Sequence, residues 1–185
     1  MNRRKLLQGL TAAPLVLAAR AAPAAERTTA DVERIRSRWR ELAPAGFEMP
    51  GVRDKVTLTE EQWRRRLGEE RFEVLREEDT EPAFSSPLNE EKRPGLFVCA
   101  GCALPLFTSE MKFDSGTGWP SFFTTIPGVF ETKRDFVLLW PRTEYHCARC
   151  GGHHGHVFDD GPPPTRERWC NNGLALRFVA ATGDL

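Results

Sequence analysis

The sequence predicts a mainly β domain preceded by a short helical segment. Fourteen prolines and fifteen glycines in 185 residues favour many turns, and therefore short strands rather than long helices. After Thr80 the chain consists of short apolar runs separated by Gly, Pro and Asp, which is the pattern of successive strands. With 40% hydrophobic residues, twelve of them Phe, the chain can bury an aromatic core, so disorder throughout is excluded.

Residues 1–25 have the composition of an export signal. Three cations at positions 3–5 precede an apolar run at 10–19, and small residues that suit a cleavage site follow. The stretch NRRKLLQ resembles a twin-arginine signal; an ordinary secretory signal or a retained amphipathic tail are the alternatives. We expect export by the twin-arginine machinery to the periplasm or beyond. The apolar run is too short to span a bilayer, so no stable membrane anchor is expected.

The charge balance argues against a nucleic-acid partner. Lys+Arg and Asp+Glu both number 26, so the whole chain has no net charge. Cleavage after residue 25 would remove four cations and no acid, which leaves the remainder at −4. A protein that binds a polyanion would need an excess of cations.

A helical lead is expected at residues 26–50, ahead of a single domain at 51–183. From Thr28 to Leu42 the apolar residues fall on one stripe, the pattern of an amphipathic helix. We expect this helix to pack on its own domain; a docking helix, a partner-binding face or a spacer are the alternatives. A second helix should begin at Thr59, which forms a capping box with Gln62, and end at Gly68.

Four strands are predicted from apolar runs between turn residues. The sequence contains no internal repeat of solenoid type and no low-complexity tract. The predicted strands are Gly95–Val98, Val129–Glu131, Phe136–Trp140 and Leu174–Val179.

Four of the five cysteines have the spacing of a zinc site. Cys99 and Cys102 form one CxxC pair, and Cys147 and Cys150 form a second. Two CxxC turns complete a tetrahedron of thiolates, and a site with four thiolates has no open position, so the ion would be structural. Two disulfides are the alternative, because the chain carries features of an exported protein.

Cys170 is the candidate nucleophile. It lies outside both CxxC pairs, and Arg168 stands two residues away, where a cation can lower the pKa of a thiol. His153, His154 and His156 lie in one short segment, and histidine can give a proton to a developing oxyanion. A buried structural thiol, and histidines that serve as alternative metal ligands, are the other interpretations.

Several segments together resemble the methionine sulfoxide reductase B family. They are TEPAFSSPLNEEKRPGLFVCAGC (80–102), SGTGWPSF (115–122), CARCGGHHGHVFDDGP (147–162) and RWCNNGLALRF (168–178). The resemblance covers about residues 52–180. It implies a mainly β, tent-like fold of two antiparallel sheets with N-terminal helices and one structural zinc. It also implies reduction of the R epimer of methionine sulfoxide, mainly in oxidised proteins and peptides.

The resemblance assigns roles to individual residues. It implies that Cys170 is the nucleophile and becomes a sulfenic acid. His153 and His156 would line the oxygen pocket, with Asn172 beside them. The resemblance makes Trp119 an apolar wall for the methyl group of the substrate, with core packing as the alternative for this residue. Arg168 would help to form and orient the substrate site, or would be a solvated charge.

The sequence departs from the family at several positions. Thr117 stands where many members have a resolving cysteine, so an internal disulfide is not expected and a thioredoxin-like or small thiol should reduce the sulfenic acid. His154, Trp169 and Asn171 replace the usual Leu, Tyr and Ile. A zinc-stabilised binding or chaperone-like module without catalysis and a thiol peroxidase are the alternative functions.

Overall fold

The computed structural model describes residues 27–135 and 142–182. The predicted signal at 1–25 and the predicted strand Phe136–Trp140 lie outside the described residues. Among the described helices, none is both long and apolar enough to cross a membrane.

The N-terminal part of the described chain is helical, but the single helix predicted for Thr28–Leu42 is divided at Arg38 into α1 (Thr29–Ser37) and the 3-10 helix η1 (Trp39–Leu42). Helix α1 is capped by Thr28, whose side chain and backbone exchange hydrogen bonds with Asp31. Val32 of this helix is buried, and Ile35 and Trp39 pack against the main core, so the helix lies on its own domain as expected. The helical segments are α1 (Thr29–Ser37), the 3-10 helix η1 (Trp39–Leu42), α2 (Glu60–Leu67) and α3 (Glu69–Glu77).

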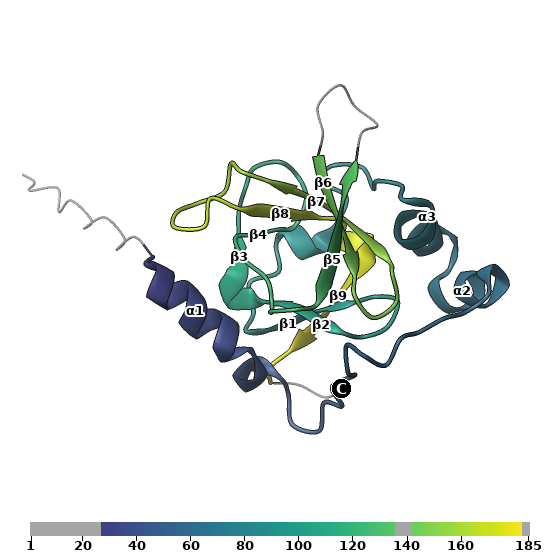
Figure 1. The fold of residues 1–185 in the computed structure, drawn as a ribbon, viewed down its shortest axis with the longest axis horizontal. Helices are drawn as coiled ribbons and strands as arrows, with labels where there is room; N and C mark the ends of the chain where they lie inside the picture. The colour runs from purple at the N-terminus through teal and green to yellow at the C-terminus, as the bar shows by residue number, and fades with distance from the viewer. Residues whose placement is uncertain (1–26, 136–141, 183–185) are drawn as a thin grey trace, which may run out of the picture.

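Helix α2 begins and ends where the sequence predicts. Thr59 and Gln62 form the capping box, and Gly68 ends the helix with a φ of 74°. Helix α3, which follows at once, is missing from the sequence-based prediction. Its Phe72 and Leu75 are buried, and the helix lies against the end of the β domain (Figure 1). Burial of its apolar side chains stabilises a helix that is too short to form alone.

The described strands form two antiparallel sheets, which confirms the predicted fold class (Figure 1). The smaller sheet has the order β2 (Pro105–Thr108), β1 (Gly95–Cys99), β9 (Leu176–Ala180). The larger has the order β3 (Lys112–Phe113), β4 (Ser121–Phe122), β8 (Arg168–Asn171), β7 (His153–Phe158), β6 (Arg142–Cys147), β5 (Phe130–Asp135). Three further 3-10 segments are η2 (Pro87–Asn89), η3 (Ser109–Met111) and η4 (Gly173–Ala175).

The predicted strands match β1, β5 and β9 with shifted ends. Strand β5 begins one residue later than predicted and continues to Asp135. The predicted strand from Leu174 starts as the 3-10 turn η4, and only its later part is β9. The sequence pattern does not predict the other described strands, although β6, β7 and β8 among them carry the candidate site.

The core between the two sheets is aromatic, in line with the composition. Phe97 of the small sheet and Phe107 beside it both contact Phe122 of the large sheet, with ring centroids 5.0 and 3.9 Å apart. All three rings are fully buried. One face of the large sheet therefore packs on this core, and the other face of the sheet can carry polar side chains.

Candidate functional site

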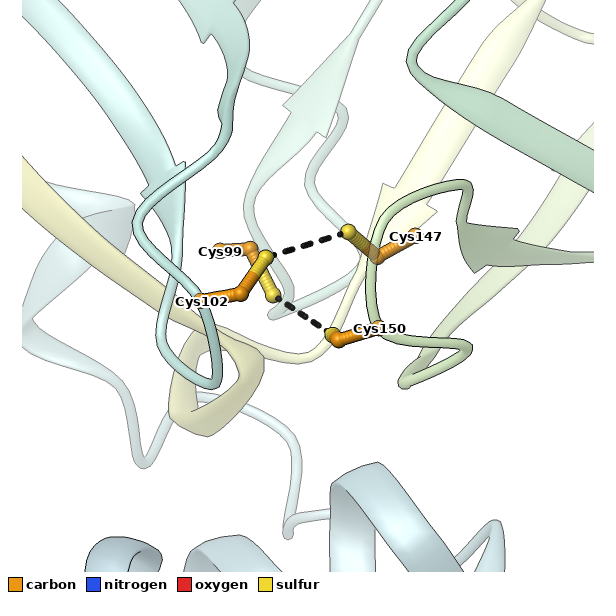
Figure 2. A group of neighbouring side chains, drawn as sticks. All are labelled: Cys99, Cys102, Cys147 and Cys150. Carbon is orange, nitrogen blue, oxygen red and sulfur yellow. Dashed lines mark hydrogen bonds between the residues drawn. The ribbon is translucent and has the colours of Figure 1, made fainter. Parts of the chain in front are cut away.

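The two CxxC pairs meet at one point. Cys99 ends β1 and Cys102 lies in the turn that follows it. Cys147 ends β6 and Cys150 lies in the turn that follows that strand (Figure 2). Their sulfurs lie 3.6 Å apart for Cys99 and Cys150, and 3.5 Å apart for Cys102 and Cys147. A disulfide bond would need about 2.05 Å. The cysteines are free thiols in this arrangement, so the disulfide alternative is not supported.

The sulfur cluster fits a tetrahedral zinc ion. Zn–S bonds of about 2.3 Å hold neighbouring sulfurs roughly 3.8 Å apart, close to the observed separations. All four cysteines are buried. Hydrogen bonds from the other three sulfurs, the one to Cys102 first, and burial raise the pKa of the Cys99 thiol well above its usual range. Four buried thiolates therefore require a cation, and the chain has one structural zinc site, as its sequence predicts.

Two arginines donate hydrogen bonds to backbone carbonyls in the turns of the zinc site. Arg149 Nη1 donates to the carbonyl of Cys102 at 2.6 Å, which ties the second turn to the first. Arg76 of α3 donates to the carbonyl of Cys150 at 2.9 Å. Four thiolates around a divalent ion carry a net negative charge, so nearby guanidinium groups also offset that charge. Nothing in the local sequence identifies either arginine, because Arg76 acts across 74 residues.

A β-bulge gathers the polar residues of the large sheet on one face. His146 pairs with His153, but Tyr145 pairs with Gly155, so β7 has one extra residue at this point. Without the bulge, residues three apart on a strand would point to opposite faces. With it, His153 and His156 share a face, and their ring centroids lie 5.8 Å apart.

The extra residue, His154, points into the aromatic core instead. Its ring lies 5.6 Å from that of Phe130, and its Nδ1 atom is 3.3 Å from Asn171 Oδ1. Burial lowers the pKa of His154 to about 3. This histidine is therefore neutral near pH 7 and takes no part in the polar face.

Cys170 lies on that polar face, directly opposite His156. The two residues are cross-strand partners on β8 and β7, a position that places Cβ atoms about 5 Å apart. Cys170 is only half-buried. Its burial raises the pKa of the thiol, while the Arg168 charge and hydrogen bonds from Thr117 and Arg168 lower it, with burial the larger effect. The resting group is therefore a thiol near pH 7, with a partial tendency to ionise.

Arg168 is not a solvated charge. It is 7% exposed, and its guanidinium makes two hydrogen bonds to Asp160, of 2.7 and 2.9 Å. The same group lies 4.3 Å from the centre of the Phe158 ring. This geometry holds a fixed cation beside the Cys170 sulfur. Asp160 is the group that orients it.

Cys170 opens into a cavity of about 210 Å³. Trp119, His156 and Asn172, to which the family resemblance assigns roles in the substrate site, are among the residues that line this cavity. The other lining residues are Thr80, Arg142, Gly155, Phe158 and Asn171. A larger hollow of about 830 Å³ between α3 and β9 holds neither cysteine nor histidine, so the smaller cavity is the candidate active site.

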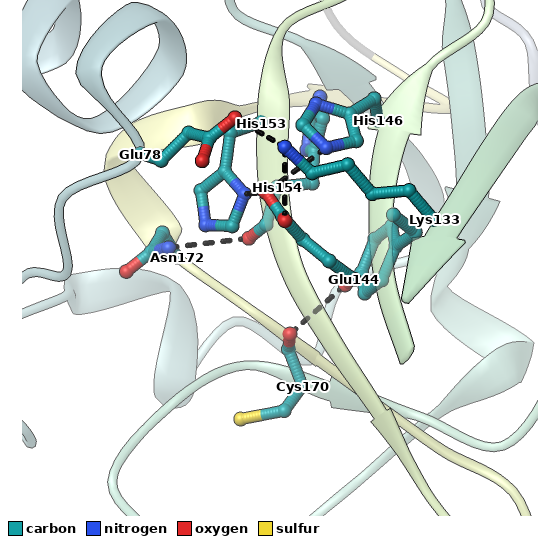
Figure 3. Close-up of polar contacts among 9 residues, drawn as sticks. Glu78, Lys133, Glu144, His146, His153, His154, Cys170 and Asn172 are labelled. Atoms are coloured by element: carbon teal, nitrogen blue, oxygen red, sulfur yellow. Dashed lines mark hydrogen bonds and ion pairs between the residues drawn. The ribbon is translucent and has the colours of Figure 1, made fainter. Parts of the chain in front are cut away.

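His153 lies behind the cavity and is not one of its lining residues. Its ring is 2% exposed, and its Nδ1 atom lies 2.5 Å from Glu144 Oε1 (Figure 3). The main effect on His153 is burial, which lowers its pKa, while Glu144 opposes that shift. Of the two histidines predicted for the oxygen pocket, the structure brings His156 to the cavity and keeps His153 in a buried contact with a carboxylate.

A buried carboxylate, Glu81, anchors two walls of the cavity. It accepts hydrogen bonds from the backbone N–H groups of Gly173 and Leu174, at 2.6 and 2.9 Å. Its own N–H donates to Asn172 Oδ1 at 3.1 Å, and its carbonyl accepts from Trp119 Nε1 at 3.1 Å. No local sequence pattern identifies Glu81, because the role of this residue depends on contacts across some ninety residues.

Thr117 continues a chain of hydroxyl groups to the nucleophile. Its hydroxyl is 2.8 Å from Ser115 Oγ, which in turn lies 2.8 Å from Ser121 Oγ. Thr117 also hydrogen-bonds the Cys170 sulfur, an interaction that favours the thiolate. The position that holds a resolving cysteine in many members of the resembled family therefore faces the nucleophile here too, with a hydroxyl in place of a thiol.

Close backbone contact at the cavity requires glycine at position 155. Its φ is 153°, and a Cβ atom there would lie 2.0 Å from the carbonyl oxygen of Cys170. Any other residue would push β8 away from β7. The glycine is thus needed for the register that places His156 opposite Cys170.

Comparisons with known proteins identify the family of this chain. A family model described as the SelR domain matches residues 67–180. The peptide methionine sulfoxide reductase MsrB of Bradyrhizobium diazoefficiens is 51% identical over 128 residues, which cover 68% of this chain and 91% of the relative. Those of Agrobacterium fabrum (47% over 125 residues, 67% and 93%) and Hahella chejuensis (45% over 132 residues, 71% and 95%) are similar. The chain belongs to the methionine sulfoxide reductase B family.

Proposed function

We propose that this protein repairs oxidised proteins by reducing the R epimer of methionine sulfoxide to methionine, with Cys170 as its nucleophile. Membership of the family supplies the reaction. The observation that carries the residue assignment is the half-buried Cys170 thiol at the cavity, with His156 as its cross-strand partner.

The chemical step transfers one oxygen atom from the substrate to Cys170. The Cys170 sulfur attacks the sulfoxide sulfur and forms an S–S bond. The protonated oxygen then moves from the substrate sulfur to the Cys170 sulfur as the S–O and S–S bonds break, and methionine leaves. Oxide is a poor leaving group, so the oxygen must be protonated during the attack. The thiol and the sulfoxide together become a sulfenic acid and a thioether, which balances atoms and protons. His156, across the strand pair, gives a proton to the oxygen, and the proton of the thiol restores it.

Asn172 and His153 complete the oxygen pocket in this proposal. The Asn172 side chain is held by Glu81 N–H and by the carbonyl of His154, to which its Nδ2 donates at 3.2 Å. An amide nitrogen has two N–H donors, so one remains for a substrate oxygen. His153 acts from the layer behind, where its contact with Glu144 fixes the orientation of the ring.

Trp119 forms the apolar wall for the substrate methyl group. Its indole N–H is already bonded to the Glu81 carbonyl, so the ring is fixed in place and leaves an apolar face toward the cavity. Arg168 lies behind the nucleophile, where it favours the thiolate as substrate arrives. The zinc ion, when bound, holds the turns after β1 and β6 together and takes no part in this chemistry.

An external thiol returns the enzyme to its starting state. The other four cysteines of the chain face one another in the zinc cluster, so none is left to form a disulfide with Cys170. Two equivalents of a thiol reduce the sulfenic acid to Cys170 thiol, water and one disulfide. A thioredoxin-like protein or a small thiol fits this requirement.

The assay that tests this function uses separated epimers of a methionine sulfoxide peptide with a dithiol reductant. We expect turnover of the R epimer only, and no turnover by Cys170→Ser, which should keep its zinc and its fold. Activity that survives in Cys170→Ser would rule out the nucleophile. A properly folded wild-type protein with no activity on either epimer would favour the non-catalytic binding module, and rapid consumption of peroxide alone would favour a thiol peroxidase.

We also propose that residues 1–25 direct export by the twin-arginine route to the periplasm. The support is the charged start, the short apolar run and the NRRKLLQ stretch. A route that carries folded proteins would let zinc load onto the cysteines in the reducing cytoplasm. Replacement of Arg3 and Arg4 by Lys should leave the protein in the cytoplasm, as measured by cell fractionation. Unchanged export would exclude this route.

A further inference from the structure

A second group of metal-ligand side chains lies on the polar face of the large sheet. Glu144 and His146 project from β6, and His153 projects from the paired position on β7. One ligand atom from each of the three lies within 4.8 Å of the other two. Figure 3 shows the side chains converging, next to Lys133. We propose that Glu144, His146 and His153 form a second divalent-metal site, which binds Zn²⁺ or a similar ion apart from the four-cysteine zinc.

The two carboxylate oxygens of Glu144 have different partners. Oε1 lies 2.5 Å from His153 Nδ1 and 2.9 Å from His146 Nε2. Oε2 lies 3.2 Å from Lys133 Nζ, and Lys133 also contacts Glu78 at 2.6 Å. An ion bound to Oε1 therefore leaves the Lys133 contact in place. Glu78 balances the Lys133 charge, so the site retains the net negative charge of Glu144.

His146 has an unsatisfied nitrogen that faces this point. Its Nε2 atom is buried and makes no hydrogen bond to any residue in the described part of the chain, although Glu144 Oε1 is near it. Buried polar groups nearly always have a partner, and an ion is one of the few explanations for an exception. Glu144 Oε1 accepts a well-aligned hydrogen bond from one imidazole N–H, and His153 is the residue that makes this hydrogen bond.

The donor set is the one that zinc takes in many proteins. Two imidazoles and one carboxylate leave a fourth position for water. Ligand bonds of about 2.0–2.2 Å hold ligand atoms roughly 3.3 Å apart, so the contacts of His153 and His146 to Oε1 need to lengthen by about 0.8 and 0.4 Å. The three side chains are already 84% buried or more, so little conformational entropy is lost on binding.

Metal at this site would occupy the Nδ1 atom of His153 that now contacts Glu144. His153 would then be held in the layer behind the cavity, with its proton on the other nitrogen. If His153 supports the oxygen pocket as proposed above, excess zinc should inhibit the enzyme through this site. Inhibition rests on the proposed function, but metal binding does not.

Zinc counting on the full chain tests the site directly. Protein that carries its structural zinc is dialysed against micromolar ZnCl₂, and bound zinc per chain is measured by mass spectrometry under native conditions. The unaltered chain should take up a second ion. His146→Gln and Glu144→Gln should keep only the first, with affinity for a second reduced at least tenfold, on the scale of effects for weakened metal sites. Glu78→Gln, which removes a neighbouring acid outside the donor set, should still bind two.

The zinc-binding and activity measurements distinguish failure of the proposed metal site from failure of the proposed role of His153 in the reaction. A second ion that His146→Gln binds as tightly as the unaltered chain, or no second ion in the unaltered chain, would overturn the proposal. Added zinc should also lower the activity of the unaltered chain while sparing His146→Gln. If zinc binds as expected but activity is unchanged, the site stands and the part given to His153 in the oxygen pocket does not.

Discussion

The zinc cluster and the cavity at Cys170 both use cysteine sulfur, but they place it in different surroundings. The four cysteines of the zinc cluster are at most 7% exposed and face each other, whereas Cys170 stands alone beside a cavity. Hydrogen bonds from the neighbouring sulfurs, and then burial, raise the pKa of the Cys99 thiol, whereas burial is the main cause that raises the pKa of Cys170. In the cluster a metal ion offsets that cost. At Cys170 a guanidinium and a hydroxyl offset only part of it, so the thiol remains protonated and available for oxygen transfer.

The largest effect should come from removing one zinc ligand. Cys102→Ser leaves three thiolates around the ion, and the bound metal supplies on the order of 10 kcal/mol to folding in small zinc domains. That is comparable to the whole stability of a domain, so we expect the protein to lose zinc and to unfold at room temperature. Metal analysis and circular dichroism would show this. Cys170→Ser is the matched control and should retain both metal and fold; equal zinc loss in both variants would contradict the division of the two sites.

A large effect on catalysis alone should come from His156. His156→Asn removes the proton donor opposite Cys170, and kcat should fall by about 10²–10⁴-fold, the usual contribution of general acid catalysis. Zinc content and melting temperature should hardly change, because the residue lines a cavity. The measurement is steady-state turnover of the R epimer. A decrease in kcat of less than tenfold would mean that a group other than His156 is the proton donor.

His154 is the matched control on the same strand and has a different expected effect. Its pKa of about 3 lies below the usual 6.5, so the unfolded chain takes up a proton that the folded chain does not bind. Stability is therefore full above about pH 6.5 and falls as pH drops toward 3, by about 1.4 kcal/mol per unit. His154→Leu should remove this slope while keeping activity within a few-fold. Denaturant unfolding at pH 7 and pH 5 measures the difference, and an unchanged slope would contradict it.

The sequence predicts the zinc cluster better than the active site, and the reason is physical. A CxxC pair encodes its geometry within four residues, so both pairs can be identified from the sequence alone. The partnership of His153 and His156 depends on a bulge opposite Tyr145, which no local pattern reveals. Strand β7 escapes prediction because a segment rich in histidine and glycine has no apolar alternation.

The supporting residues escape prediction for a related reason. Glu81, Glu144 and Asp160 are acids, which local sequence assigns to solvent or turns, and each is identified only by its partners in the fold. Arg168 can be placed near Cys170 by sequence spacing, but its burial and its fixed contact with Asp160 cannot be predicted. Site residues whose role depends on contacts between distant parts of the sequence can be identified only when the pairing of the strands is known.

A moderate effect should come from the cation beside the nucleophile. Arg168→Gln removes a charge that lowers the pKa of Cys170, so that pKa should rise further. The thiolate fraction near pH 7 then falls about tenfold for each unit of rise. The pH dependence of Cys170 alkylation by iodoacetamide measures it. Asp160→Asn should act in the opposite direction, since the Asp160 charge raises the pKa of the thiol. A downward shift in Arg168→Gln would contradict the assigned role.

The smallest effect should come from Thr117, whose hydroxyl lies beside the Cys170 sulfur. Thr117→Val removes one hydrogen bond to the Cys170 sulfur, a contact worth about 1 kcal/mol, so the rate near pH 7 should fall roughly twofold to tenfold. Thr117→Ser keeps the hydroxyl and should retain most of the rate, which separates the hydrogen bond from packing. A loss in Thr117→Ser that is absent in Thr117→Val would mean that the methyl group, and not the hydroxyl, is what matters. A rate that depends on the hydroxyl would show that Thr117, which cannot form a disulfide with Cys170, serves the attack of Cys170 on the substrate.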